Sequence, residues 1–402
     1  MVSNLETVQQ ALLGLVGTTD IERLPLEACW QRVLAENVVA DMDFPPFDRS
    51  PLDGYAVIAS EVEKAGLDAP VVLREIDSVP AGQTPHEKIT PGTACRIMTG
   101  APLPEGATGV VKLEDTERRG REIRILNGAG AARNICRRGE EIAHGEIAVA
   151  AGTVLNSGAM GTLALLGRGR PLVHTRPRVG IIVTGSELTT VDAPLAPGKI
   201  HDSNSYMLAA QVRDAGAEPV LFGVFHDNVD TICAVVEQAR HCDLILTTGG
   251  VSVGDYDLAG RVFTRLGVTP LCERVNMKPG MPVLAGQLDA RLIIGLSGNP
   301  SAASIAFEQI IRPLLLKMGG RKTWWRQSMR ATMTKPFAKT SASKRFVWAY
   351  SWMGEQGMLV EPLPLQGNGM LKSAIAANAL ISLEAGSPPV GPGENINVIL
   401  LH

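Results

Sequence analysis

The sequence predicts a multidomain protein of the α/β plus β class. Residues 178–300 alternate short β-branched runs with helical patterns, which is typical of a parallel three-layer α/β domain with helices on both faces of a sheet. Residues 71–142 and 330–402 carry short strand-like runs between turn residues, which predicts an inserted β-rich domain and a C-terminal β domain. At 402 residues the chain is too long for one typical core, and length alone suggests several domains.

The α/β domain is predicted as strands and helices in alternation. Short apolar runs that end in turn residues are expected to be strands at 179–183, 220–224, 244–248 and 292–296. Helices are expected from Ser203 to a closing Gly216, over Ile232–Ala239, over Leu258–Leu266 and from near Ser301.

Three of these strands lead into loops rich in small and polar residues, namely 184–187, 249–257 and 297–301. Ligands of open parallel sheets collect at the carboxyl ends of the strands. The 249–257 loop contains three glycines and a serine, which can turn several backbone N–H groups toward one phosphate or other oxyanion. Each loop alone has a structural explanation, because Gly-Gly and Asn-Pro are ordinary turn formers. Together the three loops favour a binding site.

Composition and charge exclude several classes of function. The formal net charge is -3, so no overall basic field favours nucleic acid or an anionic membrane. The six cysteines are scattered without a CxxC pair, which indicates a reducing compartment. The first residues lack a basic start and an apolar core, and no apolar run reaches 18 residues. We therefore expect a cytoplasmic protein without membrane spans.

The N-terminal third begins with two expected helices, at residues 5–16 and over Leu24–Ala40. Between them and the β-rich domain lies Asp43–Val57, which packs three prolines, three aspartates and an arginine together. Prolines exclude regular helix there, so the aspartates are carried on a stiff, extended segment that can aim carboxylates. A domain linker with solvated charges is the commoner explanation of such a composition, and the local sequence alone favours it.

The β-rich domain is expected to contain short strands at 71–73, 95–100, 109–113 and 122–125, and to end in the charged cluster 134–142. A helix with Leu163 and Leu165 then leads to a hinge at Gly167–Pro171. At the other end of the chain, Asn395–Leu400 is expected to be the last strand.

Seven motifs in this order resemble the molybdopterin molybdenumtransferases, that is, the bacterial MoeA proteins and the E domain of gephyrin. The motifs are Asp48–Ala56, Met98–Pro104, Asn134–Ile142, Thr184–Leu188, Gly249–Asp257, Lys278–Gly280 and Gly298–Pro300. They cover nearly the whole chain, and they raise the proline and aspartate segment from a linker to a candidate site.

The resemblance implies a homodimer of four-domain subunits, in which the inserted domain of one subunit completes the site of the other. The implied domains are residues 1–47 with 142–175, 48–141, 176–328 and 329–402. The implied reaction inserts molybdate into the dithiolene of adenylylated molybdopterin, with release of AMP and a requirement for Mg²⁺. Other proteins of molybdenum cofactor biosynthesis are expected partners.

The resemblance also implies the site residues. Five match the family's catalytic positions, namely Asp53, Glu141, Glu187, Asp227 and Lys278, of which Glu187 and Asp227 are the expected Mg²⁺ ligands. Nine match positions that hold the pterin, the nucleotide or molybdate, namely Thr99, Gly249, Gly250, Ser252, Asp257, Ser297, Asn299, Arg345 and Asn368.

Two of these residues have simpler roles that the local sequence leaves open. Asp227 stands just before an expected helix and could cap it, which is as well supported as metal binding. Glu141 stands near Arg137 and Arg138, where a surface ion pair is the commoner role.

The chain departs from the family pattern at positions that bear on the oxyanion. Met281 stands where the family usually has a second lysine, so one expected cation is absent. Ser297 often corresponds to proline, and Asn368 commonly to serine. The family's basic residue in the last domain corresponds to Lys344 or Arg345, without a fixed register. The preference between molybdate and tungstate stays open.

Two other functions compete. A non-catalytic scaffold would keep the fold and the dimer, yet it would have no need of acidic residues gathered around an anion site. Adenylyl transfer to the pterin would use a similar α/β domain, but the additional domains favour the later, metal-inserting step.

Overall fold

The structure, a computed structural model, describes residues 2–250 and 258–401. The chain divides into two compact units, of which the first comprises Met1–Glu36, Gly152–Ser157 and Arg170–His402. The second comprises Asn37–Ala151 and Gly158–Gly169. The finer division into four domains stays a prediction.

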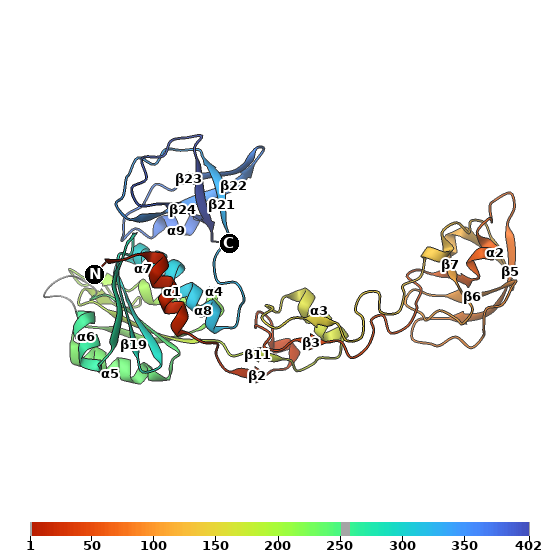
Figure 1. The fold of residues 1–402 in the computed structure, drawn as a ribbon, viewed down its shortest axis with the longest axis horizontal. Helices are drawn as coiled ribbons and strands as arrows, with labels where there is room; N and C mark the ends of the chain where they lie inside the picture. The colour runs from red at the N-terminus through yellow and green to blue at the C-terminus, as the bar shows by residue number, and fades with distance from the viewer. Residues whose placement is uncertain (1, 251–257, 402) are drawn as a thin grey trace. The chain divides into compact units, whose positions relative to one another are not determined.

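A seven-stranded sheet forms the centre of the first unit (Figure 1). In spatial order its strands are β1 (Val2–Ser3), β17 (Thr269–Val275), β19 (Pro282–Leu288), β20 (Arg291–Leu296), β16 (Leu244–Thr248), β12 (Arg178–Thr184) and β15 (Glu218–Phe225). The four strands expected from the sequence are β20, β16, β12 and β15, and they are parallel neighbours. The α/β prediction is confirmed.

One strand of this sheet runs against the others, which the sequence prediction did not include. Strands β19 and β20 are joined by only two residues, and Asp289 between them has φ 55°. So short a connection permits only antiparallel pairing, because parallel strands need a long crossover. The sheet is therefore mixed.

Helices cover both faces of the sheet (Figure 1). On one face lie α1 (Leu5–Leu15), α4 (Asn204–Asp214), α7 (Pro300–Ala306) and α8 (Arg312–Met318), and on the other α5 (Val229–Gln238), η4 (Ala239–His241) and α6 (Leu258–Leu266). Ile181 and Val183 of β12 join the first core, whereas Ile182 joins the second. Successive strand residues point to opposite faces, so a continuous apolar run was the correct signal for a buried strand.

The helix expected from near Ser301 is longer than one regular element. Helix α7 continues through a π-helical turn, η5 (Phe307–Ile311), into α8 without a break. All of the residues from Ser301 to Leu316 are buried. This continuous helix therefore forms a main support of the first core.

The C-terminal part of the first unit is a six-stranded sheet that closes on itself through an extra pairing of β22 with β24. Its strands in spatial order are β18 (Met277–Lys278), β22 (Lys344–Gly354), β23 (Gly357–Pro362), β21 (Ser328–Met333), β25 (Asn395–Leu400) and β24 (Ala379–Leu383), with helix α9 (Lys372–Ala376) beside them. We call this sheet the C-terminal barrel. The expected last strand is β25.

The second unit contains another six-stranded sheet. In spatial order it comprises β7 (Gly109–Lys112), β4 (Gly54–Val57), β6 (Thr93–Ile97), β5 (Val71–Val79), β9 (Glu122–Ile125) and β8 (Thr116–Arg119). Four strands were expected, whereas β4 and β8 were not. Shorter elements of this unit are β3 (Val38–Val39), α2 (Ala59–Val62), η2 (Leu113–Asp115), η3 (Ala131–Arg133), β10 (Ile147–Val149) and α3 (Ser157–Leu165).

The helix expected over Leu24–Ala40 is wrong. This segment forms the short turn η1 (Leu26–Ala28) and then pairs with distant parts of the chain. Leu34, for example, donates its N–H to Thr153 O at 2.9 Å, while β2 (Ile21–Arg23) pairs with β11 (Leu172–His174). Pairing with residues more than a hundred positions away overrode a local pattern that suited a helix.

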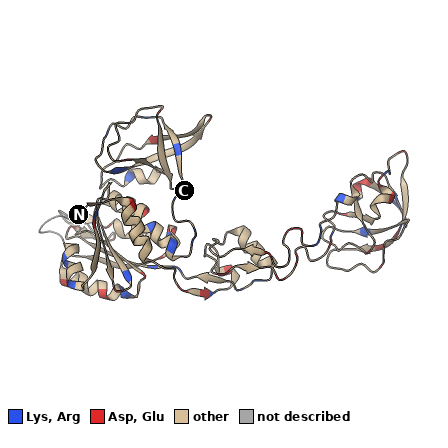
Figure 2. Cartoon of the chain, viewed as in Figure 1, with Lys and Arg blue, Asp and Glu red and all other residues tan. Residues whose placement is uncertain are grey.

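Charges are distributed rather than gathered. Acidic and basic residues are interspersed along the helices of the α/β domain (Figure 2). Among residues 2–250 and 258–401, no helix is both long enough and apolar enough to span a membrane.

Candidate active site

The three loops that follow β12, β16 and β20 meet at the carboxyl edge of the parallel strands. Asn204, the first residue of α4, donates from Nδ2 to Thr248 Oγ1 at 2.8 Å and to Gly298 O at 2.9 Å. Thr248 Oγ1 in turn donates to Ser297 O at 3.0 Å. Asn204 thus ties two strand ends to a helix start, a role that no local sequence signal had indicated.

Gly249 permits the close approach of these loops. Its φ is 95°, and a Cβ added there would lie 2.0 Å from Thr184 O, at the end of β12. The position of a Cβ on Gly298 would lie 3.4 Å from the Gly249 Cα. A side chain at residue 249 would therefore force the strand ends apart.

Polar atoms at the same edge lack partners within the described part of the chain. They are Asn204 Oδ1, Thr184 Oγ1 and Thr247 Oγ1, all buried. A buried polar atom left unpaired costs free energy, so partners for these atoms are expected from a ligand or from elsewhere in the chain. Ser252 and Asp257, the predicted nucleotide ligands, lie outside the described residues.

Glu187 and Asp227 lie at the ends of adjacent strands. Asp227 Oδ2 accepts hydrogen bonds from the N–H of Ser186 at 3.2 Å and from Ser186 Oγ at 3.3 Å. Asp227 therefore contacts the residue next to Glu187, and both carboxylates are exposed. The loop with Glu187 is further held by the pair β13 (Leu188–Thr189) and β14 (Ile200–His201).

Helix capping does not explain Asp227. The residue that caps α5 is Asn228, whose Oδ1 accepts the N–H of Thr231 at 2.9 Å. The capping alternative for Asp227 is thus wrong, and its carboxylate is available on the side away from Ser186.

These two carboxylates fit a Mg²⁺ ion in kind and number. Among the described residues no group of three or more His, Cys, Asp or Glu side chains forms a cage for a metal. Mg²⁺ is commonly held by one or two carboxylates together with substrate phosphates and water, and rarely by a cage made of protein alone. Glu187 and Asp227 match that donor set.

Lys278 and Arg345 are brought side by side by strand pairing. Strand β18 pairs with β22 in parallel, with Lys278 opposite Arg345 and Met277 opposite Lys344. Lys344 Nζ is occupied by Glu6 at 2.7 Å and by Glu384 at 3.0 Å. Of the two candidate basic residues, Arg345 is therefore the one without a carboxylate partner among the described residues.

Arg345 is a buried cation. Its Nη2 donates to Thr340 O at 3.1 Å, its Nε has no partner within the described residues, and burial lowers its pKa. Arginine nevertheless stays protonated in proteins, so the Nε–H is a buried donor without a partner among the described residues.

The loop of the C-terminal barrel that contains Asn368 lies against the start of α7. Asn368 O accepts the N–H of Ala302 at 3.2 Å, and a Cβ on Gly369 would lie 3.6 Å from Asn299 Oδ1. A buried hydrogen bond of 2.8 Å from Trp348 Nε1 to Ser301 Oγ fixes the barrel to the same helix turn. Asn299 and Asn368 are thus neighbours.

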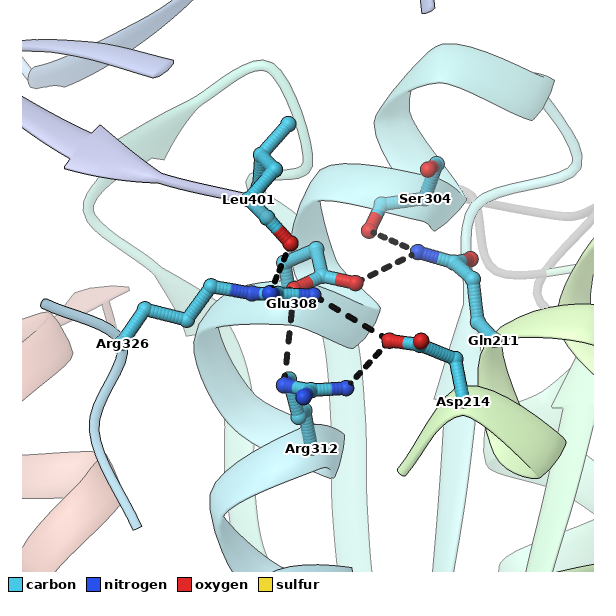
Figure 3. Close-up of polar contacts among 7 residues, drawn as sticks. All are labelled: Gln211, Asp214, Ser304, Glu308, Arg312, Arg326 and Leu401. Atoms are coloured by element: carbon cyan, nitrogen blue, oxygen red, sulfur yellow. Dashed lines mark hydrogen bonds and ion pairs between the residues drawn. The ribbon is translucent and has the colours of Figure 1, made fainter. Parts of the chain in front are cut away.

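A cavity of about 750 Å³ lies beside this region, between α4 and the C-terminal barrel. Tyr206, Trp348 and Ile375 are among the residues that line it. At its polar side Glu308, on the π-helical turn, accepts a hydrogen bond from Arg326 Nε at 2.7 Å (Figure 3).

The same polar cluster ties helices to Leu401, the residue that follows the last strand (Figure 3). Arg326 also donates to Leu401 O, and Arg312 binds Asp214 Oδ2 at 2.7 Å. The cluster therefore joins α4, the continuous helix and the C-terminal barrel.

Asp53, Thr99 and Glu141 belong to the second unit. Asp53 Oδ1 accepts hydrogen bonds from both the N–H and the hydroxyl of Thr99, each at 2.8 Å. The N–H bond of Thr99 is the main reason that the pKa of Asp53 lies below its ordinary value. Gly54 follows directly, and a Cβ there would lie 1.9 Å from Val111 O, so only glycine fits beside this aspartate.

The proline and aspartate segment is anchored, so two of its aspartates are paired rather than simply solvated, and its role in a site stays a prediction. Asp48 binds Arg137 Nη1 and the N–H of Arg138, both at 2.8 Å, while Asp43 binds Arg138 Nε at 2.6 Å. We call these four residues the aspartate–arginine clasp. Among the described residues Arg137 and Arg138 form ion pairs with Asp48 and Asp43 and none with Glu141, so the ion-pair alternative for Glu141 finds no support there.

Comparisons with known proteins agree along the whole chain. Family models match residues 3–167 as the MoeA N-terminal region (domain I and II), 180–317 as a probable molybdopterin binding domain, and 330–401 as the MoeA C-terminal region (domain IV). The chain is 37% identical to the molybdopterin molybdenumtransferase of Bacillus subtilis, over 95% of this chain and 90% of that protein. It is 35% identical to a protein of the same name from Staphylococcus epidermidis, over 99% and 95%.

Solved structures show the same relationship. The crystal structure of a molybdopterin biosynthesis MoeA protein from Pyrococcus horikoshii OT3 matches with a TM-score of 0.86 and 30% identity, and the match covers 100% of both chains. By sequence and by structure, this chain belongs to the molybdopterin molybdenumtransferase family.

Proposed function

We propose that this protein inserts molybdate into the dithiolene of adenylylated molybdopterin, with Mg²⁺-dependent release of AMP. The observation that supports this most is the meeting of three strand-end loops, through Asn204, Thr248 and Gly298, at the edge of the sheet where the exposed Glu187 and Asp227 follow two strand ends. The names of the relatives support the same transfer of molybdenum.

The acidic side of the proposed site acts on the phosphoanhydride. Glu187 and Asp227 hold the cation, with Asp227 oriented by its hydrogen bonds from Ser186. When bound there, Mg²⁺ supplies charge neutralisation for the cleavage of the anhydride. The adenylate phosphate binds in this proposal at the loop after β16, beyond Gly249, whose own N–H donates to Leu296 O at 3.2 Å.

The basic side of the proposed site holds the oxyanion. Lys278 supplies a point charge next to Arg345, and Ser297, Asn299 and Asn368 supply neutral hydrogen-bonding groups around the start of α7. The adenylate phosphate and the oxyanion thus have separate sets of donors in this proposal.

The second unit acts, in this proposal, on the site of a partner subunit in a homodimer. Asp53 is held in one orientation by Thr99, and Glu141 is exposed and forms no ion pair among the described residues. Exposed carboxylates of this kind suit a site that a second copy of the chain completes. The proteins that supply the adenylylated pterin are further proposed partners.

An assay of AMP release tests the proposal against both rivals. The purified protein is mixed with adenylylated molybdopterin and Mg²⁺, with and without molybdate, and AMP is followed by chromatography. We expect AMP release that depends on molybdate. Failure to release AMP in either mixture would favour the scaffold, and ATP-dependent adenylylation of free molybdopterin would favour the adenylyltransferase.

A further inference from the structure

Arg274 stands at the same edge of the sheet as the proposed site. Strand β17 is antiparallel to β19, which is antiparallel to β20, so β17 and β20 run in the same direction. Arg274 is the next-to-last residue of β17 and therefore lies at its carboxyl end. Two strand spacings separate β17 from β20, about 10 Å. An arginine side chain on β17, together with a bound molybdate ion, is long enough to bridge this distance to the end of β20.

The loop with Lys278 folds back onto Arg274. The N–H of Val275 donates to Met281 O at 2.9 Å, and Arg274 Nη2 lies 3.6 Å from Met281 Sδ. Gly280 in this loop has φ 95°, and a Cβ there would lie 3.0 Å from Ala302 O in the first turns of α7. The loop is therefore clamped between the end of β17 and the helix that follows Asn299.

The guanidinium of Arg274 is positioned without being neutralised. Within the described residues no carboxylate lies within 4.0 Å of it, and its side-chain contact is the uncharged thioether of Met281. The residue is only half-buried, so its remaining N–H groups can reach a ligand. Lys344 of β22, by contrast, forms ion pairs with Glu6 and Glu384. Arginine suits an oxyanion because its N–H groups form a rigid fork.

We propose that Arg274 is a binding residue for the molybdate oxyanion, supplying from strand β17 a charge that Met281 cannot supply. The inference rests on the proposed function and names one more contact for the same substrate. The alternative is a solvated arginine whose stem merely covers Met281.

Equilibrium dialysis of molybdate against the full-length protein tests this without requiring turnover. We compare the parent with Arg274→Gln, Arg274→Lys and the double variant Arg274→Gln/Met281→Lys. Loss of a charge-assisted hydrogen bond should weaken molybdate binding about tenfold or more in Arg274→Gln. Arg274→Lys should lose less, and the lysine at residue 281 should restore most of the affinity, since it returns a charge to the point that Arg274 contacts.

The control is Arg213→Gln, which removes an exposed arginine of equal charge from the last turn of α4, at the opposite end of that helix from Asn204. It should bind molybdate as the parent does. Thermal unfolding identifies any variant that fails to fold. If Arg274→Gln fails to fold, the molybdate affinity of the charge-restoring double variant tests the inference instead. Unchanged molybdate affinity in Arg274→Gln, or no recovery in the double variant, overturns the inference.

A parallel AMP-release assay separates the two proposals. If molybdate binding depends on Arg274 but no variant or parent releases AMP, Arg274 is a binding residue and the proposed reaction is wrong. If the parent releases AMP and Arg274→Gln needs no more molybdate than the parent, the reaction stands and the role of Arg274 fails.

Discussion

Asp227 is available for a ligand because its neighbour Asn228 caps helix α5. The local sequence could not distinguish these adjacent residues, since either side chain can cap a helix. The local sequence likewise could not show that Arg137 and Arg138, which stand near Glu141, pair with Asp48 and Asp43. Partners distant in sequence decided the case of the two arginines, whereas the local bond from Thr231 to Asn228 decided the case of Asp227.

The amide variants Glu187→Gln and Asp227→Asn test the proposed metal ligands. Each keeps the size of the side chain but removes a negative charge, so we expect retained pterin binding and AMP release slowed about a hundredfold or more. The matched control is Asp230→Asn, an exposed aspartate in the first turn of α5 whose partner is Arg265 at 2.9 Å. Unaltered AMP release in both amide variants would show that the metal ligands are wrong.

Asp53→Ala should abolish product formation while leaving the melting temperature close to that of the parent. The carboxylate is exposed and packs against little, although it accepts two hydrogen bonds from Thr99. Differential scanning calorimetry and the AMP assay measure the two properties on the same sample. Full activity, or loss of the folded state, would contradict this role for Asp53.

Among the secondary-structure elements, the strands and loops at the carboxyl edge of the sheet were predictable from the sequence. The side-chain hydrogen bonds that join those loops were not. Strands β12, β16 and β20 follow from short β-branched runs, and their loops follow from the glycines and polar residues after them. The bridge from Asn204 to Thr248 and Gly298 depends on side chains that only the folded sheet brings together. The false helix at 24–40 likewise depends on pairing with distant strands, whereas the missed strand β19 pairs with β20 across a local two-residue turn.

The buried cluster around Glu308 should stabilise the join between the continuous helix and the C-terminal barrel. Removing Arg326 in Arg326→Gln leaves Glu308, whose side chain is only 6% exposed, with Arg312 at 4.0 Å as its remaining cation. We expect a loss of about 3 kcal/mol in unfolding free energy, measured by urea denaturation. The control Arg240→Gln breaks a more exposed cluster with Glu237 and should cost much less, because solvent screens exposed ion pairs. Equal losses of unfolding free energy in Arg326→Gln and Arg240→Gln would mean that the buried cluster stabilises the protein no more than an exposed one.

The aspartate–arginine clasp should make the stability of the second unit depend on pH. Hydrogen bonds from the N–H groups of Arg138 and His144 are the main causes that hold the pKa values of Asp48 and Asp43 below normal. Stability from a lowered pKa is present above the unfolded value, about pH 4, and is lost as pH falls through the folded value.

Melting temperatures of the parent and of Asp48→Asn measure this effect. The parent should be the more stable at pH 7, and the difference should shrink below about pH 4, where its own carboxyl becomes protonated. Asp68→Asn, at an exposed aspartate of the same unit, should differ little from the parent at any pH. A constant difference for Asp48→Asn across the pH range would refute the charge-based explanation.

At the scale of the whole molecule, the proposed site needs residues from both compact units, and we expect a homodimer to supply them. Multi-angle light scattering should give about twice the chain mass of 42.7 kDa at micromolar concentration. As a further check, mixing an Asp53→Ala protein with an Asp227→Asn protein should restore part of the activity, because one of the two sites in a mixed dimer would then be intact. A monomeric mass, or no recovery on mixing, would count against shared sites.

The most direct measurement of the central claim is the stoichiometry of the reaction. The parent protein is incubated with adenylylated molybdopterin, Mg²⁺ and molybdate, and the pterin product is separated. Its molybdenum content is then measured by mass spectrometry beside the AMP released. The account predicts equal amounts of inserted molybdenum and AMP in the parent, and neither product in quantity from Glu187→Gln. AMP release without molybdenum in the pterin, or molybdenum insertion without AMP release, would contradict it.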